Sequence, residues 1–374
     1  MKSILIDASN LFEGGGLTHL RNFVQYFELL YDTEIKLKII GNKRALLAIS
    51  DFEKVEKISH RLLDKDIISR SYFRYFLLRK YAANTDLVLD LGGGYISYSM
   101  KYVTFSRNML IFDNVQSSKY GFSIQRFRLM FLKLIHSISI KNSCGIIFVS
   151  QHAKSVISSQ LNIENMFQSV INHGSSVNNF DIRNRRFFSI SHYSNEVPFR
   201  ILYVSKISAY KNHHILLSAV SEIRKKYPVE LILVGGYEKN TFMSFLNDIK
   251  ILDPYNDYIH YLGEQTIDDV RNQYGFADLF VFPSTCENMP NILIEAMSSA
   301  LPIVCSNSSP MPEFLKDAGI YFIPSCKYDL ERKILDVLNN VELRMMLSQR
   351  ALEYSEQYRW EKCVSETITF IRNI

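Results

Sequence analysis

Residues 278–297 read DLFVFPSTCENMPNILIEAM. The apolar run LFVF predicts a short buried strand, and PNILIEAM predicts a helix after it. One carboxylate, Glu287, comes just after the strand, and a second, Glu295, lies inside the helix. A buried strand followed by a helix is the repeating unit of α/β folds, in which ligands bind beyond the carboxyl ends of the strands. The stretch therefore predicts an α/β fold with two carboxylates near a ligand.

The same alternation of strand and helix runs through the whole chain of 374 residues. The first half contains the strand-like runs KSILIDAS, EIKLKII, DLVLDLGG, YVTFSRNMLIF, CGIIFVS and FQSVINHGS. The second half contains FRILYVSK, VELILVGG, YIHYLGE, DLFVFPST, PIVCSN and IYFIP. Apolar strands joined by helices favour a buried parallel sheet in each half, and the chain is too long for one core. We expect two Rossmann-like domains that face each other across a cleft.

A polar interruption between the two halves sets the expected domain boundaries. Residues 1–180 form the first domain, 181–194 the linker and 195–357 the second domain. Polar, irregular composition is typical of linkers between domains. The last stretch, RWEKCVSETITFIRNI, predicts a terminal helix, and residues 358–374 can pack back on the first domain.

The composition is that of an ordinary globular protein, with 47% hydrophobic and 22% charged residues. Residues 1–180 carry 22 Lys and Arg against 14 Asp and Glu, whereas the remainder carries 21 against 24. A basic first half and a slightly acidic second half indicate different partners. Five cysteines without a C-x-x-C pair indicate neither a disulfide framework nor a zinc site. Without a secretory signal or a run of about 18 apolar residues, a cytoplasmic protein lacking a spanning helix is expected.

Two lysines follow the first strand of the second half, in LYVSKISAYKN. Lys206 ends the strand, and Lys211 comes just before the next helix. Ammonium groups at a strand end suit a diphosphate, because they neutralise charge that builds up on a leaving group. Pro290 suits the first turn of its helix, whose N-terminal amides favour an anion nearby. The alternative is that both lysines are solvated, that Glu287 faces solvent and that Glu295 lies on the helix surface.

The glycine run GGG at 14–16 follows the first strand and opens a helix, so its backbone can approach a phosphate closely. It does not match G-x-G-x-x-G, and no acidic residue ends the second strand, so a nicotinamide dinucleotide site is poorly supported. No nucleic-acid recognition module is visible. The two glutamates suit sugar hydroxyls, because a carboxylate repels a phosphate.

The run of residues 274–324, from YGFADLF to IYFIP, resembles the C-terminal signature of the family 4 retaining glycosyltransferases. The family's paired glutamates, separated by seven residues, correspond to Glu287 and Glu295. ILYVSKISAYKN resembles the family's loop with two basic diphosphate ligands, with Lys206 where arginine is more usual. GGG at 14–16 and the segment VINHGS before the linker resemble parts of the family's first domain. The likeness covers nearly all of the second domain and scattered points of the first.

This resemblance implies a GT-B fold, in which the second domain holds a nucleotide-diphosphate sugar and the first holds a glycan or lipid-linked diphosphate acceptor. By analogy, Glu295 binds the ribose diol and Glu287 contacts the donor sugar. No cofactor is implied, since the nucleotide sugar is a co-substrate. The catalytic residues implied are Glu287, Lys206, Lys211 and Asn108. The binding residues implied are Gly15, Gly16, Arg107, His173, Lys206, Lys211, Asn288, Met289, Pro290, Asn291 and Glu295.

The chain departs from the family pattern in two places. Where many members have a histidine near the reacting sugar, the run TFSRNMLIF places Arg107 and Asn108, although some polysaccharide-assembly members share Asn-Met-Leu here. Ala300 replaces the glycine that often ends the glutamate-bearing helix, which implies a different helix C-cap.

The implied mechanism is front-face attack, because retention without an obvious enzymic nucleophile leaves the departing diphosphate to assist the incoming hydroxyl. The enzyme then acts by positioning and by stabilising leaving-group charge. No metal is expected. A D-x-D pair, Asp64 and Asp66, precedes a helix-like segment and lies outside any strand-end context, so it is weak evidence for a metal site.

Basic residues are interleaved with apolar ones in the first half. Residues 114–163 contain six basic residues and no acid. Lys119, Arg126 and Lys133 recur every seven residues, and another face carries Ile124, Phe127, Phe131, Leu134 and Ile138. The stretch IISRSYFRYFLLRKYAANT similarly places Arg70, Arg74, Arg79 and Lys80 among aromatics. Basic amphipathic helices bind anionic bilayers, so peripheral contact with the inner face of the cell membrane is expected. The alternative is that the apolar stripes are core.

These features predict a retaining, metal-independent glycosyltransferase of bacterial surface polysaccharide assembly. One rival is a GT-B nucleotide-sugar epimerase, which consumes the donor without an acceptor. A second rival is a catalytically silent relative that acts as a binding or scaffold protein. The presence of both glutamates and both lysines argues against silence, whereas Arg107 in place of histidine leaves it open.

Overall fold

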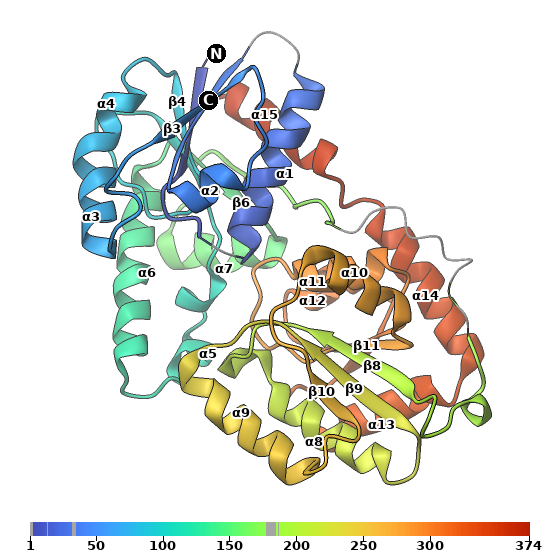
Figure 1. The fold of residues 1–374 in the computed structure, drawn as a ribbon. Helices are drawn as coiled ribbons and strands as arrows, with labels where there is room; N and C mark the ends of the chain where they lie inside the picture. Colours follow the sequence, from blue (N-terminus) through green and yellow to red (C-terminus); the bar gives the residue numbers. More distant parts are fainter. Residues whose placement is uncertain (1–2, 13, 32–34, 177–184, 186) are drawn as a thin grey trace. The chain divides into compact units, whose positions relative to one another are not determined.

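The computed structural model describes residues 3–12, 14–31, 35–176, 185 and 187–374. They form two compact units, of which the first is Met1–Gly174 with Tyr358–Ile374 and the second is Ser175–Gln357. Each unit holds one parallel sheet flanked by helices (Figure 1). The alternation of strands and helices that the sequence predicts is therefore present in both halves. None of the helices in the described residues combines the length and apolar character needed to cross a bilayer.

The first unit's sheet has the strand order β3-β2-β1-β4-β5-β6-β7, and every neighbouring pair is parallel. Its strands are β1 (Ser3–Ala8), β2 (Lys36–Gly41), β3 (Val55–Ser59), β4 (Leu87–Asp90), β5 (Tyr102–Phe105), β6 (Gly145–Phe148) and β7 (Gln168–Val170). The edge strand β3 is not predicted, because its sequence VEKIS lacks an apolar run. The strand order reverses between β1 and β4, so the loops after these two strands border the same crevice.

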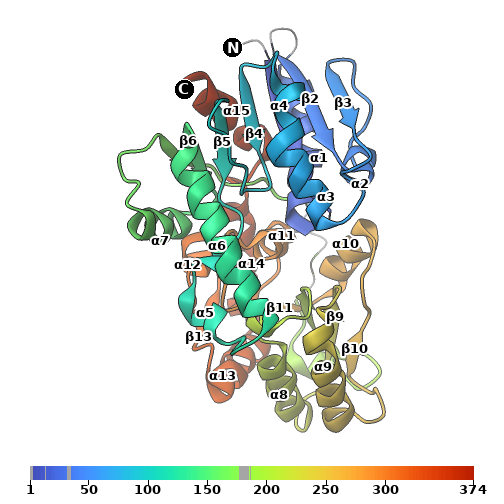
Figure 2. The ribbon, with the colours of Figure 1, turned by 90° about the vertical axis from the view of Figure 1, so that its left-hand side faces the viewer.

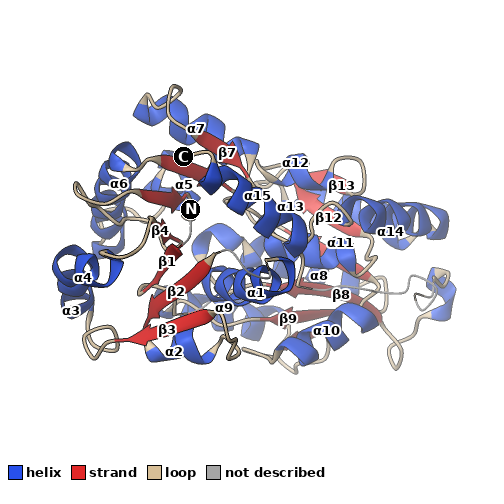
Figure 3. Ribbon diagram, turned by 90° about the horizontal axis from the view of Figure 1, so that it is seen from above, coloured by secondary structure: helices blue, strands red, loops and turns tan. Residues whose placement is uncertain are grey.

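Helices of the first unit cover both faces of its sheet (Figure 3). They are α1 (Gly14–Leu30), α2 (Lys43–Leu47), α3 (Ile67–Tyr72), the π-helical turn η1 (Phe73–Leu77), α4 (Leu78–Ala82), the 3-10 turn η2 (Met109–Ile111), α5 (Asn114–Ser118), α6 (Ile124–Asn142), α7 (Gln151–Leu161) and α15 (Trp360–Arg372). Helix α15 packs against α1, which ties the C-terminal segment to the first unit.

The first unit ends at Gly174, earlier than the expected residue 180. A Cβ at Gly174 would lie 2.3 Å from the backbone nitrogen of Trp360, so the two segments are in direct contact. Of the expected linker, residues 181–184 and 186 lie outside the described residues.

The D-x-D pair has a structural role at the start of α3. The Asp66 carboxylate accepts hydrogen bonds from the backbone nitrogens of Ile68 and Ser69, both at 2.9 Å, and so caps the helix. Asp64 accepts one from the backbone nitrogen of Lys43 at 2.7 Å. Both carboxylates are thus occupied by backbone donors.

A buried ion-pair network lies where the strand order of the first sheet reverses. Arg74, from the π-helical turn, donates to Asp7 at 2.8 Å and to Asp90 at 3.0 Å. All three side chains are at most 5% exposed. Burial lowers the pKa of Arg74, but the two aspartates outweigh that effect, so the net pKa is raised. The network holds η1 to the ends of β1 and β4.

The second unit's sheet has the strand order β10-β9-β8-β11-β12-β13, again all parallel. Its strands are β8 (Phe199–Val204), β9 (Val229–Val234), β10 (Ile259–Tyr261), β11 (Leu279–Phe282), β12 (Ile303–Ser306) and β13 (Ile320–Phe322). Its helices are η4 (Ile190–His192), η5 (Ala209–Lys211), α8 (His213–Arg224), α9 (Lys239–Leu252), α10 (Ile267–Phe276), α11 (Asn291–Ser298), α12 (Met311–Leu315), α13 (Lys327–Leu338) and α14 (Val341–Ser355). Here the strand order reverses between β8 and β11.

The end of α11 corrects the expectation of a different C-cap. Ala300 has φ = 52°, the left-handed conformation that glycine usually supplies at this point. Its nitrogen donates to the Met297 carbonyl at 2.9 Å, and the nitrogen of Leu301 donates to the Ala296 carbonyl at 3.2 Å. These are the two hydrogen bonds of a Schellman cap. The alanine therefore keeps the usual cap, at the conformational cost of a Cβ in left-handed backbone.

Candidate functional site

The loops after β8 and β11 meet because these strands are neighbours in the second sheet. Leu279 and Phe280 of β11 pair with Ile201 and Leu202 of β8. The loop after β8 carries the two predicted lysines, and the loop after β11 carries Glu287. Lys211 and Glu287, 76 positions apart in sequence, thus come together at the carboxyl edge, where α/β sheets bind ligands.

Lys211 and Glu287 form an ion pair between these loops. Lys211 Nζ lies 2.5 Å from Glu287 Oε1, and each side chain is only 12% exposed. The Ser284 hydroxyl donates to the same oxygen at 2.6 Å. The alternative of a solvated Lys211 and a solvent-facing Glu287 is therefore wrong. The sequence analysis missed Ser284, although its position three residues before Glu287 is a short-range signal.

The charge of Lys211 depends on its partner. Burial alone would lower the pKa of Lys211, but the Glu287 carboxylate and the nearby Tyr210 and Tyr203 more than compensate, so its pKa is raised. Lys211 therefore stays protonated at neutral pH, in an environment from which water is largely excluded. A cation in such surroundings interacts strongly with an anion that reaches it.

Hydrogen bonds to backbone carbonyls fix the positions of the two loops. The backbone nitrogen and the hydroxyl of Thr285 both donate to the Tyr210 carbonyl, at 2.8 and 2.9 Å. The Tyr203 hydroxyl donates to the Lys211 carbonyl at 3.0 Å. Asn212 adopts the left-handed conformation and donates to the Pro324 carbonyl at 2.9 Å. The position of Lys211 is thus set before any ligand arrives.

Lys206 lies in a different environment from Lys211, although both stand in one loop. Its side chain is exposed, directly after the end of β8. The loop therefore provides one largely buried cation, Lys211, and one exposed cation, Lys206. A buried cation orders the ligand, whereas an exposed one is screened by water and salt.

Helix α11 begins just after the Glu287 loop. Pro290 precedes the first helical residue, Asn291, rather than standing in the first turn. Met289 and Pro290 are buried, while Asn288 and Asn291 are half-buried. Asn291 Oδ1 is buried and has no hydrogen-bond partner within the described residues. Since buried polar atoms are rarely left unpaired, a ligand donor is expected at this oxygen.

Glu295 lies on the same helix but joins a different contact. The Tyr274 hydroxyl, from α10, donates to Glu295 Oε2 at 3.2 Å. Burial raises the pKa of Glu295 to about 7, against smaller opposing effects of Tyr274 and Arg271. Glu295 is half-buried, so the alternative of a carboxylate on the helix surface is wrong. The sequence analysis missed Tyr274, which no local spacing connects to Glu295.

The raised pKa of Glu295 predicts a measurable loss of stability with rising pH. Between pH 4.5 and about 7 the unfolded chain ionises this carboxyl while the folded chain keeps its proton, so unfolding releases a proton. Stability falls as pH rises through this window, by about 2–3 kcal/mol. We expect the wild type to lose this amount relative to Glu295→Gln in urea unfolding from pH 4.5 to 7.

The matched control is Glu342→Gln, on the exposed first turn of α14. A stability difference between wild type and Glu295→Gln that does not change with pH would contradict the assignment.

In the first unit, Arg107 lies beside the glycine run. Its guanidinium Nη1 would be 3.6 Å from a Cβ at Gly16, and its Nη2 contacts His19 Nδ1. Gly15 and Gly16 stand in the first turn of α1, which begins at Gly14. Burial lowers the pKa of Arg107 to about 10. Asn108 follows as the half-buried residue before η2.

His173 packs in an aromatic cluster of the first unit. It is 4% exposed, and its ring stacks on Trp360 with centroids 5.7 Å apart. The His19 ring lies 4.4 Å from it. Burial, followed by Arg107 and His173, lowers the pKa of His19, which keeps that imidazole neutral. The sequence analysis missed His19, which stands on α1, 88 residues before Arg107 in the chain.

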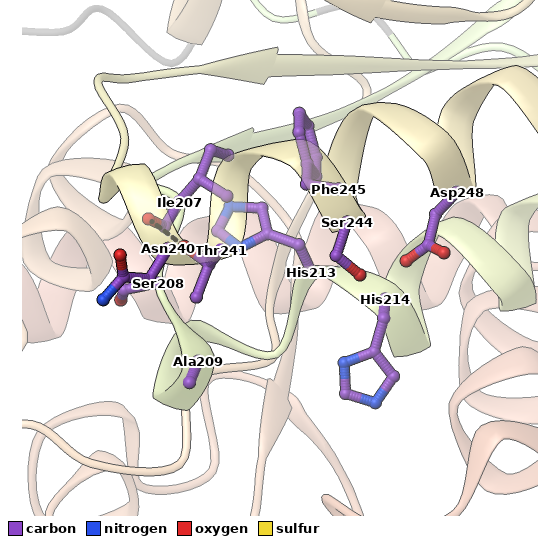
Figure 4. Close-up of a pocket in the computed structure, with 10 residues that line it drawn as sticks. All are labelled: Ile207, Ser208, Ala209, His213, His214, Asn240, Thr241, Ser244, Phe245 and Asp248. Carbon is purple, nitrogen blue, oxygen red and sulfur yellow. Dashed lines mark hydrogen bonds between the residues drawn. The ribbon is translucent and has the colours of Figure 1, made fainter. Parts of the chain in front are cut away.

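A small hollow opens next to the Lys211 loop in the second unit. Figure 4 shows residues from η5, the start of α8 and α9 around it, among them Ser208, His213 and Asp248. Burial, helped by Lys211, lowers the pKa of His213 to about 3, so this imidazole is neutral. The volume of about 200 Å³ is below the range of typical ligand sites. The hollow is therefore too small to hold a nucleotide sugar.

Metal ligands are not grouped in the part of the chain that the structure describes. No three His, Cys, Asp or Glu side chains there stand close enough to hold an ion. The cysteines in this part of the chain are free thiols.

Comparison with known proteins points to one family. The family model described as glycosyl transferases group 1 matches residues 184–354. O-antigen chain mannosyltransferase B of Escherichia coli is 31% identical over 171 residues, 45% of this chain and 44% of that protein. The capsular polysaccharide biosynthesis glycosyltransferase CapM of Staphylococcus aureus is 25% identical over 264 residues, 67% of this chain and 68% of that protein. The chain spans about half the length of the first curated relatives that it matches.

Solved structures match the whole chain at low identity. Sucrose-phosphate synthase from Thermosynechococcus elongatus has a TM-score of 0.78 at 14% identity and covers 100% of this chain and 99% of its own. HepE of Anabaena, in complex with UDP and glucose, has a TM-score of 0.71 at 18% identity, with coverage of 100% and 99%. WaaG, a glycosyltransferase involved in lipopolysaccharide biosynthesis, has a TM-score of 0.69 at 13% sequence identity, and the match covers 98% of each chain. These matches confirm the GT-B fold predicted from the sequence.

Proposed function

We propose that this chain, which has the GT-B fold, is a group 1 glycosyltransferase that moves a sugar from a nucleotide-diphosphate sugar to a glycan or lipid-linked acceptor. The reaction is retaining, needs no metal and serves bacterial surface polysaccharide assembly. O-antigen and capsule enzymes among the relatives support this choice of pathway class. The protein works in the cytoplasm, at the inner face of the cell membrane.

The observation that carries the proposal is the largely buried Lys211–Glu287 pair at the carboxyl edge of β8 and β11. A desolvated cation at this edge suits a diphosphate, and the start of α11 adds backbone amides that favour the same anion. Glu287 Oε1 is occupied by Lys211 and Ser284, but Oε2 accepts no hydrogen bond within the described residues. That second oxygen is available to a hydroxyl of the donor sugar.

In the proposed site, Lys206 and Lys211 bind the diphosphate and Glu295 accepts from the ribose diol. Residues Asn288 to Asn291 border the sugar. The first unit contributes the other proposed residues. Asn108 is catalytic, and the substrate-binding residues are Gly15, Gly16, Arg107 and His173. Because burial raises the pKa of Glu295, hydrogen bonds from ribose hydroxyls would favour the ionised form of this carboxyl group.

The proposed step exchanges one bond for another on the same face of the sugar. The bond between the anomeric carbon and the diphosphate oxygen breaks as the acceptor oxygen bonds to that carbon. The acceptor's proton passes to the departing diphosphate. Lys211 stabilises the charge that grows on this leaving group, and Glu287 fixes the sugar's orientation.

Nucleotide binding tests the proposal directly. The purified protein is titrated without metal with UDP, GDP, ADP and their sugars while its thermal stability is followed. Saturation at about 100 times Kd stabilises the fold by about 2.7 kcal/mol. One nucleotide should raise the unfolding temperature in the wild type and in the surface control Lys250→Ala, and have no effect in Glu295→Ala.

The outcomes separate the proposal from its rivals. No shift with any nucleotide contradicts the donor site and favours the scaffold alternative. A shift together with conversion of the donor sugar to its epimer, in the absence of acceptor, favours the epimerase alternative.

A further inference from the structure

Helix α6 turns an apolar surface away from the sheet. Its exposed apolar residues are Ile124 (90% exposed), Phe127 (64%), Met130 (60%), Phe131 (62%) and Leu134 (58%). At 3.6 residues per turn these positions fall within an arc of about 120°. The buried residues of α6, Leu129, Ser139 and Ile140, lie on the other side. The alternative that this apolar stripe is core is therefore wrong, and the five exposed residues form what we call the outer face of α6.

The turn before α6 extends this surface. Phe122 is fully exposed, and Val115 of α5 is 69% exposed. The Ser123 hydroxyl accepts from the backbone nitrogen of Arg126 and caps α6, so the turn has a defined geometry. A fully exposed phenylalanine next to an apolar helix face lowers the solubility of a protein unless a partner covers it.

The neighbouring helical segment carries a second apolar surface. Ile68, Tyr72 and Phe76 are 78%, 52% and 57% exposed, at a spacing of four residues, which places them on one side of α3 and η1. Figures 1 and 2 show α3, α4 and α6 side by side on one face of the first unit. The two apolar surfaces therefore belong to neighbouring helices of the first unit.

Basic side chains border the outer face of α6 on both sides. At 3.6 residues per turn, Arg128 lies beyond one edge of the apolar arc, and Arg126 and Lys133 lie beyond the other. Arg79 and Lys80 are exposed at the end of the second surface. No acidic residue occurs between positions 114 and 163. This is an apolar strip with positive edges.

We infer that the outer face of α6, together with Phe122 and the α3–η1 surface, docks on an anionic lipid bilayer. An apolar strip enters the acyl boundary while basic edges contact anionic headgroups. A second copy of this chain fits less well, because a two-fold contact would bring the basic edges against each other. A nucleic acid offers phosphates to the basic residues but nothing that would cover Ile124, Met130 or Leu134.

The inference rests on the first unit alone and does not require the proposed reaction. If the chain transfers sugar to a lipid-linked acceptor, this surface brings the acceptor and the enzyme to one membrane plane. A chain that binds vesicles but no nucleotide would keep this inference and contradict the proposed function.

Vesicle co-sedimentation tests the surface. The full chain is mixed with phosphatidylcholine vesicles, with or without phosphatidylglycerol, at low and high salt. Binding should require phosphatidylglycerol and weaken at about 1 M salt, where the Debye length is about 3 Å. Arg126→Gln, Arg128→Gln and Lys133→Gln together should weaken partitioning by about 100-fold, since each basic residue near the surface contributes about 5-fold.

Matched variants distinguish binding through the outer face of α6 from a general effect of surface hydrophobicity or charge. Phe127→Ser with Phe131→Ser should weaken partitioning by about 100-fold, because two exposed aromatic side chains no longer insert into the acyl boundary. The controls are Met243→Ser with Ile251→Ser, on the exposed side of α9, and the triple change Lys226→Gln, Lys239→Gln and Lys250→Gln. Both controls should bind like the wild type. Circular dichroism and thermal unfolding verify that each variant is folded.

Three results would overturn the inference. One is absence of binding to phosphatidylglycerol vesicles by the folded wild type. Another is binding that neither the triple basic variant nor the double phenylalanine variant reduces. The last is a concentration-dependent dimer, seen by analytical ultracentrifugation, that Phe127→Ser with Phe131→Ser abolishes while vesicle binding is absent, which would assign the surface to a second copy.

Discussion

Replacing Lys211 by alanine is expected to lower kcat/KM for sugar transfer by about 1,000-fold, the effect of deleting one desolvated group that stabilises developing charge. Lys211 is 12% exposed and paired with Glu287, so little solvent screening weakens its effect on a diphosphate. The measurement is initial rate against donor concentration with the nucleotide sugar that the binding titration identifies.

Lys206→Ala is the matched control for this prediction, since it removes the other lysine of the loop. Lys206 is exposed, so water and salt screen its charge, and the expected loss is about 10-fold. Equal losses in the two variants would show that burial does not set the contribution of Lys211. More than a tenth of the wild-type activity in folded Lys211→Ala would remove it from the proposed catalytic set.

Breaking the Lys211–Glu287 pair is also expected to lower the stability of the folded protein. Glu287→Gln and Lys211→Met should each lower the free energy of unfolding by about 3–5 kcal/mol, because each leaves the other charge buried without its partner. The double variant should recover most of this loss, since replacing both members of a buried pair removes the uncompensated charge. Urea unfolding of the wild type, both single variants and the double variant measures the coupling.

The double variant also separates stability from function. It should be as well folded as the wild type and yet transfer no sugar, because neither the diphosphate cation nor the sugar-binding carboxylate remains. Losses that simply add in the double variant would contradict the ion pair as a coupled unit. Recovered activity in the double variant would show that the pair is structural and would contradict its proposed role.

The fold could be predicted to a large extent because its signals are local. Each apolar run in the second half corresponds to a strand, from β8 to β13. In the first half, β3 was missed and β5 was predicted too long, ending at Phe105 rather than continuing through Phe112. An edge strand such as VEKIS has no apolar run, and the residues after β5 are apolar because they pack in a turn.

For the candidate site, the sequence predicted where the residues stand along the chain but not which side chains they contact. The positions of Glu287, Glu295 and the two lysines after strands follow from spacing. Two of their partners do not: Tyr274 donates to Glu295 from 21 residues away, and His19 contacts Arg107 from 88 residues away, which no periodicity spans. The Arg74 network likewise joins residues from three separate elements.

The sequence alone determined most of the order of strands and helices, the parallel α/β class and the residues that stand at strand ends, because these depend on short-range patterns of apolar and polar side chains. Only the tertiary structure decided which of two lysines in one loop is buried, since that depends on the loop after β11 packing over Lys211 and not over Lys206. It also decided that the apolar side of α6 faces outward. Helical periodicity shows that a helix has two faces, but the neighbouring strands and helices determine which of them is covered.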